Sequence, residues 1–215
     1  MTPRVVILSA PSGGGKTTIT QALRERRNDV GYSVSATTRP PRPGERDGDA
    51  YHFVTRGEFE RLIAEGEFLE WAEYAGNLYG TLRGEVKRVQ STGKHVLLDI
   101  EVHGARQVRR ECPPPESISV FVLPPDPDTW IDRLVGRETE AVAVLAQRLH
   151  RAISEIRESL DWEHTVINDD LDAVVAEVGT IIDEDGAVPH RPPAPRLVRL
   201  VEDLVSAAER HRPPA

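Results

Sequence analysis

The stretch Ser9-Ala10-Pro11-Ser12-Gly13-Gly14-Gly15-Lys16-Thr17-Thr18 decides the fold of this 215-residue chain. An apolar run at residues 5–8 precedes it, and a helical pattern at residues 19–24 follows it. A strand, a glycine-rich turn and a helix in this order are typical of a loop that holds phosphate oxygens with its backbone N–H groups. The positive end of the following helix reinforces such a site.

Each residue type in this loop has a chemical use. Lys16 supplies a mobile positive charge for the outer phosphates of a nucleotide, and the Thr17 hydroxyl is suited to binding Mg²⁺. Ala10 stands where the pattern G-x-x-x-x-G-K-S/T has its first glycine, so we expect a backbone there that is not left-handed. The alternative is an ordinary glycine-rich turn with a solvated lysine. The nucleotide-binding residues predicted here are Ala10, Pro11, Ser12, Gly13, Gly14, Gly15, Lys16, Thr17 and Thr18.

The composition limits what the rest of the chain can do. A formal net charge of −8 argues against broad nucleic-acid binding. The single cysteine, Cys112, excludes an intrachain disulfide and gives no metal cluster. We find no signal peptide and no apolar run long enough for a membrane span, so we expect a cytoplasmic protein without a membrane partner.

Strand-like and helix-like patterns alternate along the chain. Strands are expected at residues 32–35, 51–54, 95–99, 118–123 and 165–167, and helices at 55–65, 82–91, 129–135, 140–160 and 171–183. This alternation predicts an α/β fold with a parallel sheet and crossover helices. After residue 186, four prolines indicate an extended connector. An amphipathic helix with Leu197, Val201 and Leu204 on one face follows, and it is expected to pack on the body or on another subunit.

Four further stretches follow one another in order: residues 35–45, 47–53, 68–74 and 76–81. They resemble the GMP-binding signature of guanylate kinases, which are P-loop nucleoside monophosphate kinases, and the resemblance covers about residues 4–184. It implies a guanylate kinase domain at residues 1–186, with a parallel-sheet core, an inserted GMP-binding subdomain at about 35–86 and a helical lid at about 126–155. Residues 187–215 would be a proline-rich connector and a C-terminal helix.

The residue types in these stretches suit a nucleoside monophosphate. Paired arginines bind phosphate in a planar, bidentate manner, and tyrosine hydroxyls add hydrogen bonds without charge. A carboxylate matches the N1–H and 2-amino groups of guanine, and the resemblance gives this role to Glu70. Alone, Glu70 would be a surface carboxylate, Arg39 and Arg42 solvated side chains, and Trp71 a packing residue. The GMP-binding residues that the resemblance implies are Ser35, Arg39, Arg42, Tyr51, Glu70, Tyr79, Thr81 and Asp99.

Downstream residues complete the resemblance. Arg137 and Arg148 resemble the lid arginines of the family, and with Lys16 and Arg42 they form the implied catalytic set, because arginines neutralise charge in phosphoryl transfer. Asn168 matches the loop that contacts the ATP base, although alone it is more often a helix cap. Two departures from the family pattern stand out: His103 replaces the usual glutamine, and residues 141–143 are more apolar than usual.

The resemblance therefore implies transfer of the γ-phosphoryl group of ATP to GMP, with Mg²⁺, giving ADP and GDP. ATP and GMP would be the partners, with no nucleic acid, and a homo-oligomer is left open. Two alternatives remain. One is a non-catalytic guanylate-kinase-like scaffold, which typically lacks a working phosphate loop; the other is a P-loop kinase for a different small acceptor, which would have no reason to share the Arg39, Tyr51 and Glu70 set.

Overall fold

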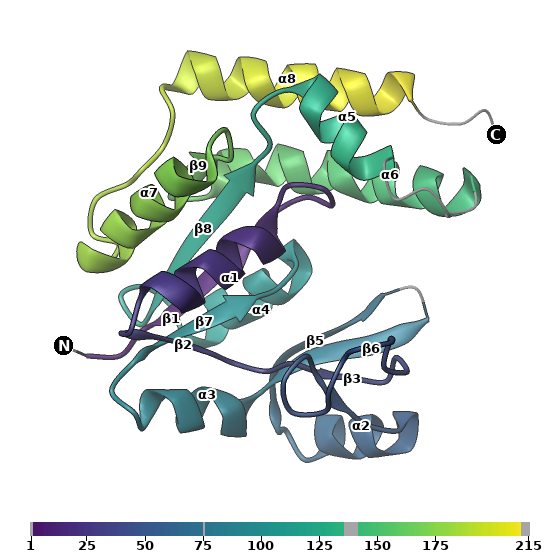
Figure 1. The fold of residues 1–215 in the computed structure, drawn as a ribbon, viewed down its shortest axis with the longest axis vertical. Coiled ribbons are helices and arrows are strands. Elements are labelled where there is room, and N and C mark those ends of the chain that lie inside the picture. Colours follow the sequence, from purple (N-terminus) through teal and green to yellow (C-terminus); the bar gives the residue numbers. More distant parts are fainter. Residues whose placement is uncertain (1, 75, 136–141, 212–215) are drawn as a thin grey trace. The chain divides into compact units, whose positions relative to one another are not determined.

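The computed structural model describes residues 2–74, 76–135 and 142–211. These residues form two compact units, which we describe one at a time (Figure 1). The first unit contains Met1–Ile7 and Arg24–Ile118, and the second contains Leu8–Leu23 and Ser119–Ala215. The domain boundaries expected from the sequence stay a prediction.

A five-stranded sheet has the strand order β2-β7-β1-β8-β9. In the first unit, β2 (Val30–Tyr32) pairs in parallel with β7 (His95–Asp99). In the second unit, the part of β8 (Ser117–Leu123) from Val120 onward pairs in parallel with β9 (His164–Ile167). Every residue of β1 (Val5–Ser9) and β8 is buried, as expected for strands of a parallel sheet with both faces covered. The predicted α/β class with a parallel core is confirmed.

The first unit also contains a four-stranded sheet of order β4-β3-β6-β5. Its strands are β3 (Ala36–Thr37), β4 (His52–Phe53), β5 (Phe68–Tyr74) and β6 (Asn77–Leu82). Helix α2 (Arg56–Ala64) supplies Phe59, whose ring stacks on Phe68 at a centroid distance of 4.3 Å. These two rings, with Ala36 and Leu78, form the hydrophobic core of this small sheet.

Two more helices belong to the first unit, α3 (Arg83–Gln90) and α4 (Val102–Glu111). Helix α4 contacts β5. Thr55 caps the start of α2, since its hydroxyl accepts a hydrogen bond of 3.2 Å from the backbone N–H of Glu58.

The second unit contains most of α1 (Lys16–Arg26), namely its residues up to Leu23. It also contains the helices α5 (Pro127–Val135), α6 (Val142–Glu158), α7 (Leu171–Asp183) and α8 (Ala194–Arg210) and the 3₁₀ helix η1 (Ser159–Asp161). Helix α8 contacts both α5 and α6, as Figure 1 shows in yellow and green. It buries Leu197, Val201 and Leu204. The prediction that the terminal helix packs on the body is confirmed within this unit.

The connector before α8 runs beside the edge of β9. The Thr165 N–H donates a hydrogen bond of 2.8 Å to the carbonyl oxygen of His190. The His190 N–H donates in turn to Nδ1 of the buried His164 ring at 3.2 Å. The connector is therefore joined to the sheet by backbone and side-chain bonds.

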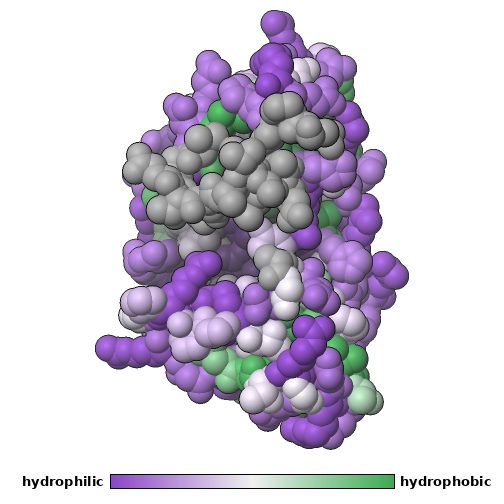
Figure 2. Space-filling model, turned by 90° about the vertical axis from the view of Figure 1, so that its right-hand side faces the viewer, coloured by the Kyte–Doolittle hydropathy of each residue, from purple (hydrophilic) through white to green (hydrophobic). Residues whose placement is uncertain are grey.

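Several sequence expectations were wrong in detail. Residues 33–35 form a loop, although a strand was predicted over 32–35. Strands β5 and β6 and helix α4 had not been predicted as elements. Trp71 does not pack in a core, because 39% of it is exposed. The coloured residues on the face seen in Figure 2 are mostly hydrophilic. Within the described ranges, none of the helices has the length and apolar character needed to cross a membrane.

Candidate functional site

The phosphate loop lies in the second unit, between β1 and α1. Gly13 and Gly15 have φ angles of +81° and +89°, in the left-handed region that favours glycine. Ala10 is not among the positive-φ residues of the described chain, which confirms the expectation for that position. The Gly14 N–H donates to the Pro11 carbonyl at 2.8 Å and closes the turn.

Close packing explains why this loop is rich in glycine. A Cβ atom on Gly14 would lie 2.9 Å from the Cβ of Ala10. A Cβ atom on Gly15 would lie 2.2 Å from Nδ2 of Asn168. That nitrogen donates a hydrogen bond of 2.9 Å to the Gly14 carbonyl, and Asn168 is buried. Asp170, rather than Asn168, caps helix α7, by accepting from Ala173 N–H at 2.9 Å.

Side chains from α5 and α6 hold the other side of the loop at Ser12. The Trp130 indole N–H donates to the Ser12 carbonyl at 2.8 Å. The guanidinium of Arg148 donates to the Ser12 hydroxyl from Nε at 3.2 Å and from Nη2 at 3.0 Å. Arg148 is only 8% exposed, so the structure brings this predicted arginine to the phosphate loop. Arg137 lies outside the described residues.

Two residues near this loop were absent from the predicted site. Trp130 carries no charge, and its role depends on a contact 118 residues away in the sequence. Arg133 has its Nη1 atom 3.9 Å from the position that a Cβ on Gly15 would occupy. Arg133 lies in the stretch that the resemblance assigns to the lid, about residues 126–155, and an arginine there is a signal that could have included it.

Lys16 and Thr17 open helix α1, where the first backbone N–H groups have no partner within the helix. Thr17 and Thr18 are exposed. The described residues contain no group of three or more His, Cys, Asp or Glu side chains placed to hold a metal ion. Magnesium commonly binds through one or two protein oxygens together with substrate phosphates, and the exposed Thr17 hydroxyl suits that arrangement.

The predicted phosphate clamp lies in the first unit, in the loop after β3. The Arg39 guanidinium donates from Nη2 to both carboxylate oxygens of Glu45, at 2.8 and 2.9 Å. Glu45 also accepts from the backbone N–H of Arg42 at 2.8 Å. The hydrogen bond to Arg39 lowers the pKa of Glu45, with a smaller contribution from the bond to Arg42. Glu45 therefore organises this loop, a role that sequence reasoning did not assign to it.

Aromatic rings surround the Arg39 side chain. Its guanidinium carbon lies 5.4 Å from the Tyr51 ring centroid and 5.8 Å from that of Phe53. The Tyr51 and Tyr79 rings meet edge to face at 6.0 Å. The structure thus brings Arg39, Tyr51 and Tyr79 together, as predicted. Arg42 lies in the same loop, with an exposed side chain.

Glu70 owes its orientation to an irregularity in β5. Phe68 pairs with Leu82 and Glu70 pairs with Thr81, so Leu69 is an extra residue on its strand. Because Thr81 and Leu82 are consecutive, their side chains point to opposite faces of the sheet, and so do those of Phe68 and Glu70. The bulge sends Phe68 to the α2 side and turns Glu70 to the opposite side.

The carboxylate of Glu70 is buried and polar contacts hold it. Glu70 is 5% exposed and Thr81 is 1% exposed. The Thr81 hydroxyl donates a hydrogen bond of 2.7 Å to Oε1 of Glu70. The structure thus brings this predicted pair together, and it contradicts the interpretation of Glu70 as a surface carboxylate. A buried carboxylate with acceptor capacity is suited to reading hydrogen-bond donors on a ligand.

The remaining predicted residues of this unit lie on neighbouring elements. Asp99 ends β7. Burial raises the pKa of the Tyr32 hydroxyl, and the charges of Asp99 and Tyr51 raise it further. Ser35 precedes β3, and its carbonyl oxygen accepts from His52 N–H at 2.9 Å. His103 is exposed on α4.

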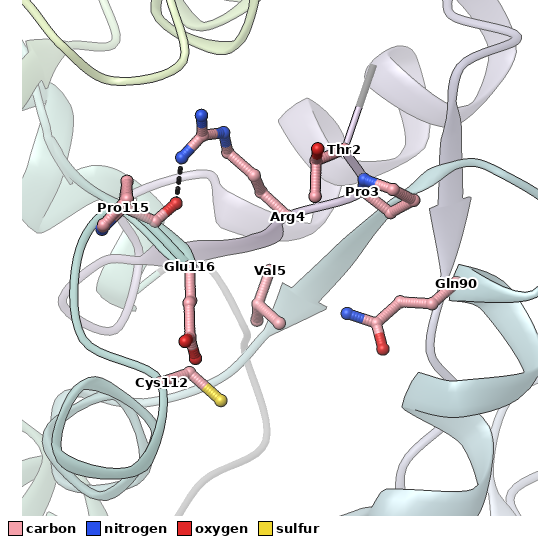
Figure 3. Close-up of a pocket in the computed structure, with 8 residues that line it drawn as sticks. All are labelled: Thr2, Pro3, Arg4, Val5, Gln90, Cys112, Pro115 and Glu116. Atoms are coloured by element: carbon pink, nitrogen blue, oxygen red, sulfur yellow. Dashed lines mark hydrogen bonds between the residues drawn. The ribbon is translucent and has the colours of Figure 1, made fainter.

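A separate cavity of about 350 Å³ in the first unit contains none of the predicted substrate residues. Cys112, Glu116, Gln90 and Arg4 help to line it, and Arg4 donates a hydrogen bond to the Pro115 carbonyl (Figure 3). Burial raises the pKa of the Cys112 thiol, and the nearby Glu116 and Glu111 raise it further. The thiol is therefore poorly suited to act as a nucleophile.

Comparisons with known proteins identify the family that the chain resembles. The family model described as guanylate kinase matches residues 2–185. A guanylate kinase of Nostoc sp. is 46% identical over 81% of this chain and 87% of its own length. One of Symbiobacterium thermophilum is 45% identical over 92% of this chain and 93% of its own length. The crystal structure of guanylate kinase from Anaplasma phagocytophilum superposes with a TM-score of 0.70 at 28% identity, covering 92% of this chain and 94% of that one.

Proposed function

The chain belongs to the guanylate kinase family, and we propose that it transfers the γ-phosphoryl group of ATP to GMP, giving ADP and GDP. It is a nucleoside monophosphate kinase, an ATP:GMP phosphotransferase. The observation that carries the base specificity is the buried Glu70 carboxylate with Thr81 bonded to one of its oxygens. Guanine offers two donors on one edge, whereas adenine would leave the buried carboxylate unsatisfied.

The acceptor is held by the loop and the small sheet of the first unit. Arg39 and Arg42 bind the GMP phosphate, and Tyr51 and Tyr79 donate hydrogen bonds to it. Glu70, Thr81 and Ser35 read the base, and Asp99 lies in the substrate and metal neighbourhood. Arg39 must exchange its Glu45 partner for the phosphate or share it, because its guanidinium already donates to that carboxylate.

The donor is held by the phosphate loop of the second unit. Residues Ala10, Pro11, Ser12, Gly13, Gly14, Gly15, Lys16, Thr17 and Thr18 surround the ATP phosphates, and Asn168 contacts the adenine side. A phosphate oxygen of GMP is already a nucleophile, so the reaction requires no general base. Lys16, Arg42, Arg137 and Arg148 neutralise the charge that develops on the transferred group. The bond of Arg148 to Ser12 supports its place beside the phosphates.

Kinases of this family generally use a divalent metal together with ATP. We assign Mg²⁺ as that ion and Thr17 as the protein residue that would hold it. Bound there, the ion would supply positive charge that offsets the charge of the nucleotide phosphates. The exposed hydroxyl at the start of α1, next to Lys16, supports this assignment.

The alternatives fit less well. A scaffold protein would not need a closed phosphate loop, yet here Asn168, Trp130 and Arg148 all support one. A kinase for another acceptor would not need a buried carboxylate beside Thr81.

We also propose a cytoplasmic enzyme without a nucleic-acid partner, supported by the single cysteine and the net charge of −8.

Chromatography of the reaction products tests the proposal. Purified protein is incubated with ATP, GMP and Mg²⁺, and we expect ADP and GDP to appear in equal amounts. The chelator EDTA should stop the reaction, and added Mg²⁺ should restore it. Release of ADP without GDP, or no GMP-dependent reaction from folded protein, would contradict the proposal.

A further inference from the structure

Helix α4 packs against β5, and a glycine lies at the point of closest approach to Glu70. Gly104 is buried in the first turn of α4. A Cβ atom built there would lie 2.3 Å from Oε2 of Glu70 and 2.9 Å from its Cδ. These distances are shorter than any normal contact, so the carboxylate occupies the space that a side chain at position 104 would fill.

The same contact has an electrostatic aspect. The first turn of a helix carries partial positive charge, which interacts favourably with a carboxylate. Glu70 therefore has Thr81 on one oxygen and the start of α4 beside the other. Burial of both residues leaves the carboxylate little freedom to move.

One turn further along α4, Gln107 fixes the backbone next to Glu70. Its side-chain nitrogen donates to the Trp71 carbonyl at 2.8 Å, and its side-chain oxygen accepts from the Trp71 N–H at 3.3 Å. Both backbone groups of one residue are thus paired with one amide side chain. This pairing ties β5 to α4 immediately after the bulge that turns Glu70.

We propose that Gly104 and Gln107 are positioning residues for guanine recognition. Gly104 leaves space for the Glu70 carboxylate, and Gln107 holds the backbone of β5 in place next to Glu70. The inference rests on the proposed function, because it concerns the carboxylate assigned to the base. Neither residue touches the nucleotide. They determine the orientation in which the carboxylate meets the 2-amino and N1–H groups.

The experiment compares how tightly the protein binds GMP and inosine 5′-monophosphate, which lacks the 2-amino group. Isothermal titration calorimetry on the full chain gives both dissociation constants without requiring catalysis. The Kd for inosine 5′-monophosphate divided by the Kd for GMP is the ratio that measures recognition of the 2-amino group. The variants are Gly104→Ala, which places a methyl against the carboxylate, and Gln107→Met, which keeps the volume but removes both bonds to Trp71. Glu70→Gln is the positive control. Gln90→Met, the same substitution at the end of α3, is the matched negative control.

We expect Gly104→Ala to lower the ratio by about tenfold or more, since small displacements of a polar group in a binding site have large effects. Gln107→Met should lower it by about threefold, and Gln90→Met should leave it at the wild-type value. The KM for ATP should stay unchanged in both positioning variants. A purely structural role would instead weaken both ligands equally and lower the midpoint of thermal unfolding.

The outcomes separate the inference from the proposed function. Wild-type ratios in both Gly104→Ala and Gln107→Met, with a reduced ratio in Glu70→Gln, would overturn the inference and leave the function intact. A change in only one of the two variants would remove the other residue from the proposal. An unchanged ratio in Glu70→Gln would contradict the role of Glu70 and the inference with it, while GDP formation in the product assay would still report on catalysis.

Discussion

The side-chain amide of Asn168 donates a hydrogen bond of 2.9 Å to the carbonyl oxygen of Gly14, a residue 154 positions earlier in the sequence. The bond joins the end of β9 to the middle of the phosphate loop. Both residues are buried, so this polar contact is protected from water. Asn168 thereby stabilises the conformation of the loop at Gly14.

Replacing Asn168 by Asp tests this relationship. The substitution keeps the shape of the side chain but places an oxygen where a donor is needed, so a buried carbonyl and a carboxylate would face each other. We expect the KM for ATP to rise by about tenfold, in line with the cost of an unsatisfied buried polar group. Steady-state kinetics with varied ATP measures this, and the KM for GMP serves as the internal control. An unchanged KM for ATP would show that the bond is dispensable.

Replacing Lys16 by Ala removes the mobile charge at the start of α1. Because that charge is assigned to the transferred phosphoryl group, kcat should fall by about 10³-fold or more. Calorimetry should show that GMP binding stays largely intact. Turnover close to the wild-type level would overturn the assignment of the phosphate loop.

Glu45 offers a test of the phosphate clamp. It ties Arg39 and the Arg42 backbone together, so Glu45→Ala should loosen a preorganised loop and raise the KM for GMP by about threefold to tenfold. The KM for ATP should not change. A lower KM for GMP would instead mean that Glu45 competes with the phosphate for Arg39.

The terminal helix provides a prediction about stability. Leu204 is fully buried in α8, which contacts α5 and α6. Leu204→Ala should lower the free energy of unfolding by about 2–4 kcal/mol, because it creates a cavity in a packed interior. Urea denaturation measures the change, with the exposed Val198→Ala on the same helix as the control. A loss as small as that of the control would show that α8 is only loosely attached.

His164 predicts how stability depends on pH. Burial lowers the pKa of its imidazole, and the charge of His190 lowers it further, while Glu163 and Glu184 and the Gly186 carbonyl oppose this shift. The unfolded chain, with a histidine pKa of about 6.5, then binds more protons than the folded one. Stability should therefore be lost as the pH falls below about 6.5. His164→Asn keeps an acceptor for the His190 N–H and should flatten the dependence of stability on pH between about 7 and 5; an equally steep dependence would exclude His164 as its source.

The sequence predicted the elements whose signals are local. The strand, glycine turn and helix around Lys16 occupy consecutive residues, and the continuous apolar run of β8 is typical of a buried parallel strand. The β5–β6 hairpin was missed because the bulge at Leu69 interrupts the alternation of buried and exposed residues. Helix α4 was missed although its buried residues Val102, Ala105 and Val108 lie at helical spacing.

For Arg39 and Glu70 the family resemblance, rather than the residue type alone, supplied the candidates, and the structure places them beside Tyr51 and Thr81. Site residues were missed where the role depends on distant packing. The bond from Trp130 to Ser12 joins residues 118 positions apart, and Gly104 matters only because Glu70 occupies its space. Glu45 lies within the stretch at residues 35–45, but its pairing with Arg39 depends on how the proline-rich loop closes. Such relationships exist only in three dimensions.

The most direct test of the central claim is a coupled assay of ADP release with ATP and Mg²⁺, comparing GMP, AMP, UMP and CMP as acceptors. Base recognition by the buried Glu70 carboxylate predicts turnover with GMP alone. Comparable rates with another monophosphate would contradict the assignment of Glu70 to guanine. No turnover with any acceptor, from folded protein that binds GMP, would contradict the claim that this chain is an active kinase.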